Sequence, residues 1–260
     1  MRNVRKYGKA PFNVAVIHGG PGAPGEMAPV ARELAHSVGV LEPFQTGDTV
    51  EKQVEELRAI LTENAALPVT LIGYSWGAWL SFITSSCHPS LIRKLILISS
   101  GPFEEKYSRD IMKKRLSRLV DAERQETLSL IDSFNVPNRD NMSKKMARFG
   151  QLISKADSYD PLPHADEVVG MQFRVFQKVW KDAEQLRRSG ELLKSGKHIQ
   201  CPVLAIHGAY DPHPAEGVEK PLSGVLKEFK FILLRNCGHT PWIERQARDE
   251  FYKILKRECR

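Results

Sequence analysis

Short apolar runs alternate with stretches of helical periodicity along most of the chain. A run of four to eight apolar, often β-branched residues between turn-forming residues is typical of a buried strand. Apolar residues that recur every three or four positions are typical of an amphipathic helix. The strands expected on this basis are 12–17, 39–44, 69–72, 91–100, 202–206 and 229–234. The helices expected are 26–38, 48–65, 78–87, 217–226 and 242–256.

The order of these elements predicts the fold class. Strand and helix alternate with short connections up to residue 101 and again from residue 200, which is typical of βαβ units in a parallel sheet covered on both faces. Between them the periods are mainly helical, as at Met142, Met146, Phe149 and Ile153. We therefore expect an α/β fold with a mostly parallel, doubly wound sheet. Residues 1–101 and 200–260 would form its core domain, and residues 102–199 a helical cap.

Composition narrows the class of protein. The chain has 260 residues, of which 42% are hydrophobic, enough for one large core with an inserted subdomain. The net charge is +7, but the densest basic run, Lys113-Lys114-Arg115, has apolar neighbours at helical spacing. We interpret this run as the solvated face of an amphipathic helix and expect no nucleic-acid partner. No run of 18 apolar residues occurs, so we expect no membrane partner.

The cysteines and the N-terminal segment bear on the cellular compartment. Residues 1–9 are basic, but the apolar run behind them, 12–17, is too short for the core of a signal peptide. The four cysteines are scattered without a CxxC pair, which favours reduced thiols over a disulfide framework or a zinc site. We expect a cytoplasmic protein with no metal and no organic cofactor. The sequence does not give its oligomeric state.

The motif Gly73-x-Ser75-x-Gly77 joins the strand at 69–72 to the helix that follows. In this setting the pattern is a nucleophile elbow, a sharp turn that projects the serine hydroxyl away from the backbone. Side chains two positions either side of the serine would crowd the turn, so both positions take glycine. The competing interpretation is a serine that only caps the helix.

Two further polar residues follow predicted strands, Asp211 after 202–206 and His239 after 229–234. In doubly wound sheets, ligands bind at the carboxyl ends of the strands, so we expect both residues to meet Ser75 there. A serine hydroxyl needs a base to become a nucleophile, and histidine can take its proton and later return it. A carboxylate beside the other ring nitrogen orients the imidazole. The expected catalytic residues are Ser75, His239 and Asp211.

The turn at 18–22 (HGGPG) follows the first expected strand and lacks the spacing of nucleotide-binding loops. Its glycines allow the backbone to approach a ligand and to aim N–H groups at it. We expect an oxyanion hole formed by the backbone N–H groups of Trp76 and Gly20, with Gly19 as the second choice. His18 is expected to support this loop through hydrogen bonds.

These motifs together resemble the α/β-hydrolase superfamily. They are HGGPG at 18–22, GYSWG at 73–77 and CGHTP at 237–241, and the order serine, aspartate, histidine is also that of this superfamily. HGGPG with a tryptophan after the serine is most similar to the proline iminopeptidase branch. The resemblance covers residues 12–101 and 200–260 and implies a helical cap after the sixth strand of the family fold.

The sequence departs from that family at two places. Only about eleven residues precede the first expected strand, so the N-terminal antiparallel hairpin is expected to be short or absent. The insertion shows no assignable carboxylate for the amino group of a peptide, and Glu104 and Glu105 are candidates by position only.

Several residues admit a structural and a functional interpretation. His213 is either a loop residue or part of the pocket lining, and Phe173 and Phe176 belong either to the core of the cap or to an apolar pocket wall. We include these three residues, with His18 and Gly19, as candidate substrate-binding residues. Residues interpreted as structural are His207 at a strand end, and Asp48, Asp157 and Asp160 as caps or turn residues.

The function expected from these residues is that of a serine hydrolase. It would cleave an ester, thioester or amide of a small molecule or short peptide through an acyl-enzyme. An aminopeptidase that releases N-terminal proline or a similar residue is the competing enzyme. A non-catalytic ligand receptor on the same fold is a third possibility, which turnover of an activated ester would separate from an enzyme.

Overall fold

A computed structural model describes residues 3–134, 141–165, 167–170 and 172–259. Seven strands form one sheet in the order β1-β3-β2-β4-β5-β6-β7, and every pair is parallel except β1 with β3. The strands are β1 (Val4–Tyr7), β2 (Phe12–Ile17), β3 (Gly39–Pro43), β4 (Val69–Tyr74), β5 (Ile92–Ile98), β6 (Val203–Gly208) and β7 (Phe229–Leu234). The expected α/β class with a mostly parallel sheet is confirmed.

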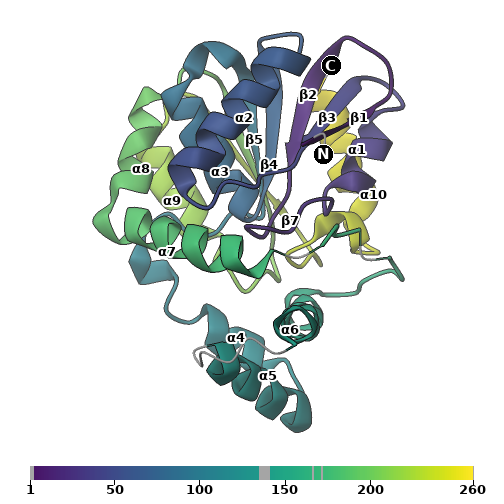
Figure 1. Cartoon of the computed structure of the whole chain (residues 1–260), viewed down its shortest axis with the longest axis vertical. Helices are drawn as coiled ribbons and strands as arrows, with labels where there is room; N and C mark the ends of the chain where they lie inside the picture. Colours follow the sequence, from purple (N-terminus) through teal and green to yellow (C-terminus); the bar gives the residue numbers. More distant parts are fainter. Residues whose placement is uncertain (1–2, 135–140, 166, 171, 260) are drawn as a thin grey trace.

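Helices cover both faces of the sheet (Figure 1). The helices are α1 (Ala28–Leu34), α2 (Val50–Asn64), α3 (Trp76–Cys87), α4 (Ile111–Ser117), α5 (Asp121–Phe134), α6 (Met142–Asp157), α7 (Phe173–Ser189), α8 (Glu191–Ser195), α9 (Glu216–Val225) and α10 (Arg248–Glu258). One hydrophobic cluster joins the sheet to α1 and α10, and a second joins its other face to α2, α3, α8 and α9. Alternate side chains of each buried strand enter opposite clusters, as Leu71 and Ile72 do.

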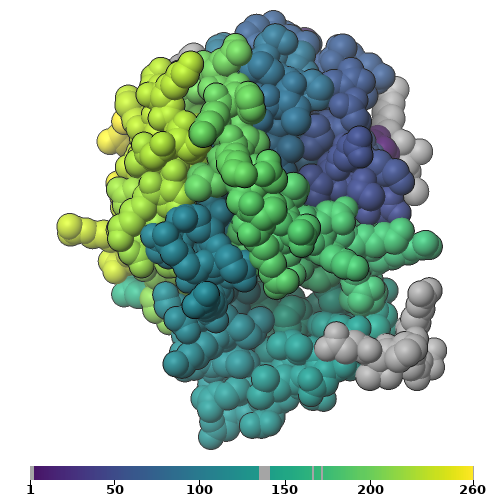
Figure 2. Space-filling model, turned by 90° about the vertical axis from the view of Figure 1, so that its left-hand side faces the viewer, coloured from purple at the N-terminus to yellow at the C-terminus, as the bar shows by residue number. Residues whose placement is uncertain are grey.

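The helical segment between β5 and β6 divides into two parts. Helices α4, α5 and α6 lie together at one end of the molecule, beyond α7 (Figures 1 and 2). Helix α7 instead buries Val175, Val179 and Ala183 in the same cluster as α2 and α3. Among the described helices, none combines the length and apolar character needed to cross a membrane.

Several elements differ from the sequence-based expectation, and two of these differences are larger than a shifted end. Strand β1 was not predicted; its sequence VRKY lacks a clear apolar alternation, and it pairs antiparallel with β3 at the sheet edge. The last helix begins at Arg248 rather than 242, because residues Pro241–Ile243 form a short 3₁₀ turn. The N-cap of α2 is Thr49, whose side chain accepts the N–H of Lys52 at 3.2 Å.

Candidate active site

Ser75 lies at the turn between β4 and α3 in a strained backbone conformation, with φ 52° and ψ −114°. Its N–H donates to the carbonyl of Ile98 at 2.9 Å, which ties the turn to β5. The flanking glycines are required by space. A Cβ at Gly73 would overlap the carbonyl oxygen of Gly77, and a Cβ at Gly77 would overlap that of His18. Close packing of the turn against the neighbouring loop therefore holds the hydroxyl in place.

The structure brings Ser75, His239 and Asp211 into one hydrogen-bonded chain. His239 Nε2 lies 3.0 Å from Ser75 Oγ, and His239 Nδ1 lies 2.7 Å from Asp211 Oδ2. An ionised carboxylate only accepts hydrogen bonds, so Nδ1 carries the proton and Nε2 of the neutral ring accepts from the serine hydroxyl. This arrangement can take a proton from Ser75.

The electrostatics of Asp211 and His239 fit this direction of proton transfer. Burial would raise the pKa of Asp211, but the neighbouring histidines outweigh burial and hold that pKa well below its usual range. Burial would lower the pKa of His239, but the charge and hydrogen bond of Asp211 outweigh it and raise the pKa. Asp211 thus stays ionised and makes His239 a stronger base.

His213 lies against the acid of this chain. Its backbone N–H and its Nδ1 both reach Asp211 Oδ1, at 2.9 Å and 2.8 Å, and its ring centroid is 4.6 Å from that of His239. Burial lowers the pKa of His213 to about 4, so the ring is a neutral donor. His207 in turn lies 2.9 Å from the carbonyl of His213 through its Nε2. The contact of His213 with Asp211 was not predicted from the sequence, although the spacing of two residues between them was a signal.

Three of these side chains also meet the distance condition for a metal. One ligand atom each from Asp211, His213 and His239 lies within 4.8 Å of the others. Each imidazole Nδ1 is hydrogen-bonded to the carboxylate, however, which is the arrangement that proton transfer needs.

The loop at 18–22 distinguishes the two candidate oxyanion donors. The N–H of Gly19 donates to Glu26 Oε2 at 2.9 Å, so it is already engaged. His18 Nδ1 donates to the carbonyl of Gly20 at 3.2 Å, which matches the expected supporting role of His18. Burial lowers the pKa of His18 to about 4, so this ring is neutral. Gly20 is therefore the better candidate for the second N–H donor, beside Trp76.

Phe173 and Phe176 point to different surroundings. Phe173 packs on Phe134 of α5, with ring centroids 5.8 Å apart. Phe176 stacks on Trp180 at 6.2 Å, and Trp180 stacks on Trp79 of α3 at 6.1 Å. Only the second set connects α7 to the helix that begins directly after Ser75.

Two interpretations of charged residues are corrected by the structure. Arg115 does not lie on a solvated face, and Asp157 is not a simple cap: their side chains are only 15% and 5% exposed and form a bidentate pair.

The candidate amine-binding residues Glu104 and Glu105 both form ion pairs within the chain. Glu104 pairs with Lys106, and Glu105 pairs with Arg187 and Arg188. Asp48 pairs with Lys52 and Lys178, and Asp160 pairs with Arg245, so both aspartates form ion pairs away from the triad.

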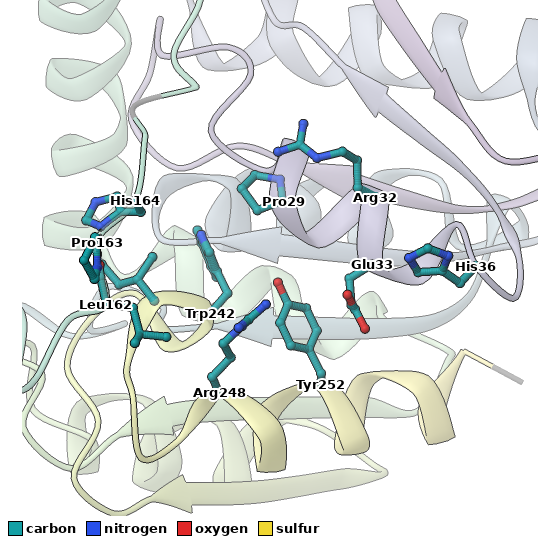
Figure 3. A pocket seen from close by; sticks show the side chains of 11 residues that line it. Pro29, Arg32, Glu33, His36, Leu162, Pro163, His164, Trp242, Arg248 and Tyr252 are labelled. Carbon is teal, nitrogen blue, oxygen red and sulfur yellow. Dashed lines mark hydrogen bonds between the residues drawn. The ribbon is translucent and has the colours of Figure 1, made fainter.

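A separate cavity of about 330 Å³ lies between α1, α10 and residues 162–164 (Figure 3). Arg248 and Tyr252 rise into it from α10. Trp242 lines it and packs on Tyr74 at 4.6 Å, and Tyr74 packs on His239 at 5.1 Å. The cavity is thus a neighbour of the candidate active site and does not include its hydroxyl.

Comparison with known proteins identifies the class. A family model described as the alpha/beta hydrolase family matches residues 14–254. The chain belongs to this family and is a hydrolase.

Individual relatives refine the resemblance. The chain is 24% identical over 299 residues to a proline iminopeptidase of Lactobacillus crispatus (strain ST1), covering 97% of this chain and 91% of the relative. The solved structure of VinJ is similar with a TM-score of 0.68 at 17% identity, over 99% of this chain and 95% of that one. A proline iminopeptidase of Mycobacterium smegmatis is similar with a TM-score of 0.63 at 16% identity, over 98% and 93% of the two chains. The expected similarity to the proline iminopeptidase branch is confirmed.

Proposed function

We propose that this protein is a serine hydrolase that cleaves a carboxylic ester, thioester or amide through an acyl-enzyme. The observation that carries the proposal is the hydrogen-bonded chain from Ser75 Oγ through His239 to Asp211, with distances of 3.0 Å and 2.7 Å. A strained serine turn at the start of α3 supports it as well.

The roles follow from the chemistry of acyl transfer. His239 Nε2 takes the proton of Ser75 as Oγ attacks the substrate carbonyl, and then gives that proton to the leaving group. Asp211 accepts a hydrogen bond from the Nδ1–H of His239 throughout the reaction and stabilises the imidazolium that forms. Water, activated by the same histidine, then hydrolyses the acyl-enzyme and frees Ser75.

The oxyanion would be held by the backbone N–H groups of Trp76 and Gly20. Trp76 begins α3, so its N–H lies at a helix N-terminus, where orphan donors favour a negative charge. The assignment of Gly20 rests on the engagement of the alternative, Gly19, by Glu26. Residues 102–199 would act as a cap beside these groups, and its aromatic residues would contact an apolar part of the substrate.

An aminopeptidase is the second candidate because relatives named proline iminopeptidase align along nearly the whole chain. That activity needs a carboxylate for the amino group of the substrate. Glu104 and Glu105 are poor candidates, since both are paired with cations of the chain itself. We therefore place acyl esters and thioesters before aminoacyl amides.

The test combines active-site labelling with a substrate panel. A fluorophosphonate should label the wild-type protein but not Ser75→Ala, while Ser90→Ala, which changes an exposed serine, should label normally. Ser75→Ala and His239→Ala should each lower turnover by orders of magnitude, and the double variant little further. Equal labelling of Ser75→Ala would exclude Ser75 as the nucleophile. Rates on acyl esters, acyl thioesters and prolyl amides then rank the possible substrates.

A further inference from the structure

The C-terminal end of α6 touches both loops that carry the partners of Ser75. The backbone N–H of His239 donates to the carbonyl of Asp157 at 2.9 Å. Arg118 donates to the carbonyl of Ala156 at 2.9 Å and to that of Tyr210, the residue before the triad acid, at 2.7 Å. Two successive residues of α6 are therefore tied to the two loops that supply the base and the acid.

A buried ion pair fixes the end of α6. Arg115 of α4 donates from Nε to Asp157 Oδ1 at 2.8 Å and from Nη2 to Oδ2 at 2.6 Å. Two parallel bonds fix both the distance and the plane of the partners, which a single contact does not. The loop of His239 also packs closely against the end of α6, because a Cβ on Gly238 would overlap the carbonyl oxygen of Asp157. The loop of His239 and the end of α6 cannot shift independently.

We propose that Arg115 and Asp157, both in the inserted helical segment, are positioning residues that hold the loop of His239 in place and balance the charge beside its imidazole. This inference rests on the proposed role of His239 as the base. It makes the inserted segment part of the catalytic apparatus, in addition to any role in binding substrate.

The charges around His239 give the two residues opposite effects. Asp157 raises the pKa of His239 and Arg115 lowers it, after the larger effects of burial and of Asp211. Together the pair is neutral, so its two contributions oppose each other, and removing one partner exposes the effect of the other. Among the described residues, other titratable groups near His239 or in its loop are Tyr74, His207, Asp211, His213, Cys237 and Glu244. Burial raises the pKa of the Cys237 thiol, so this group is uncharged. Burial lowers the pKa of His207 and His213 and raises that of Tyr74, so these three are neutral near pH 7.

Two substitutions that each remove one charge of the pair distinguish a positioning role from a packing role. Asp157→Asn leaves the charge of Arg115 and should lower the pKa of His239, whereas Arg115→Gln leaves the charge of Asp157 and should raise it. Each shift should have the sign that the remaining charge dictates, since a nearby anion favours the protonated imidazole and a nearby cation disfavours it. The double variant should return the pKa close to the wild-type value. Each single variant should also lose about tenfold or more in kcat, because a displaced imidazole no longer meets the serine hydroxyl.

The matched control is another bidentate pair between helices of the same segment, Arg148 with Glu126, at 2.8 Å and 2.7 Å. Arg148→Gln and Glu126→Gln should leave the pH profile of kcat/KM unchanged. Melting temperatures of all variants show which of them remain folded. Shifts of the His239 pKa in the same direction for Asp157→Asn and Arg115→Gln, or no shifts while the melting temperature falls, would overturn the proposal and leave the pair a packing element only.

The pKa of His239 can be measured independently of the proposed function. Titration of the His239 imidazole by NMR in the Ser75→Ala background gives its pKa without any turnover. If the wild-type protein hydrolysed no substrate while the opposite shifts were still seen, the proposed function would fail and the placement of the pair would stand. If turnover were normal and the opposite shifts were missing, only the present inference would fail.

Discussion

Glu244 offers the sharpest test of how the loop of His239 is held. Its side chain is fully buried, and its carboxylate accepts three backbone N–H groups. Oε1 accepts those of Tyr159 and Gly238 at 2.8 Å and 2.9 Å, and Oε2 accepts that of Asp160 at 2.8 Å. One carboxylate thus joins the residue before His239 to the chain that follows α6. We predict that Glu244→Gln and Glu244→Ala both destabilise the protein, by different amounts.

The expected losses in the free energy of unfolding follow from the number of hydrogen bonds that each variant loses. A hydrogen bond to a charged group contributes about 1.5–3 kcal/mol, and a buried donor left without a partner costs about 1–3 kcal/mol. In Glu244→Gln the amide oxygen can keep the two bonds of Oε1, but its NH₂ then faces the N–H of Asp160, so we expect a loss of about 2–3 kcal/mol. Glu244→Ala loses all three bonds, and we expect about 4–6 kcal/mol, below the simple sum because the loop can relax and admit water.

Urea unfolding monitored by circular dichroism measures both values. The control is Glu216→Gln, which breaks an exposed ion pair with Lys220 at 2.8 Å and should leave the free energy of unfolding close to that of the wild type, because solvent screens exposed pairs. Turnover at 25 °C should fall in Glu244→Gln even where the protein remains folded, because Gly238 precedes the base. A Glu244→Gln variant as stable as Glu216→Gln would refute the assignment of the three hydrogen bonds, and so would equal losses for Gln and Ala.

Two further predictions concern activity. Because the pKa of His239 is raised above 6.5 and the ring must be neutral to accept a proton, kcat/KM should rise with pH through a midpoint above 6.5 and be lost below it. A midpoint below 6.5 in the pH profile would contradict this. Phe173→Ala should lower the melting temperature without changing the ranking of acyl chain lengths, since this ring packs on Phe134. Phe176→Ala should change that ranking, because its stack reaches Trp79 of α3, the helix that follows Ser75. The opposite pattern would indicate that Phe173, and not Phe176, contacts the acyl chain.

Local patterns were sufficient to predict six of the seven strands and to propose the candidate triad. Buried strands such as 69–74 appear as apolar runs because both faces of a parallel sheet are covered, and Ser75 lies in a turn whose glycines stand at fixed positions. Asp211 and His239 could be placed because both follow strands that end at the same edge of the sheet.

Contacts between distant parts of the chain could not be predicted in the same way. The pair of Arg115 and Asp157 spans 42 positions, and nothing local distinguishes a buried arginine from its solvated neighbours Lys113 and Lys114. The three bonds of Glu244 involve backbone groups, which leave no trace in residue types. Strand β1 was missed because an edge strand with Arg5 and Lys6 does not show the apolar run of a buried one.

The point of insertion of the helical segment has a consequence for how this enzyme could diversify. The segment leaves the sheet after β5 and returns at β6, two strands that lie side by side, with Leu95 opposite Val203. Such neighbouring ends would normally allow the whole insertion to be exchanged for another without disturbing the sheet. Here a transplant of residues 102–199 would also remove the partners of Tyr210 and His239. New specificity cannot be grafted onto this scaffold as a separate module; a donor segment must bring its own support for the two loops.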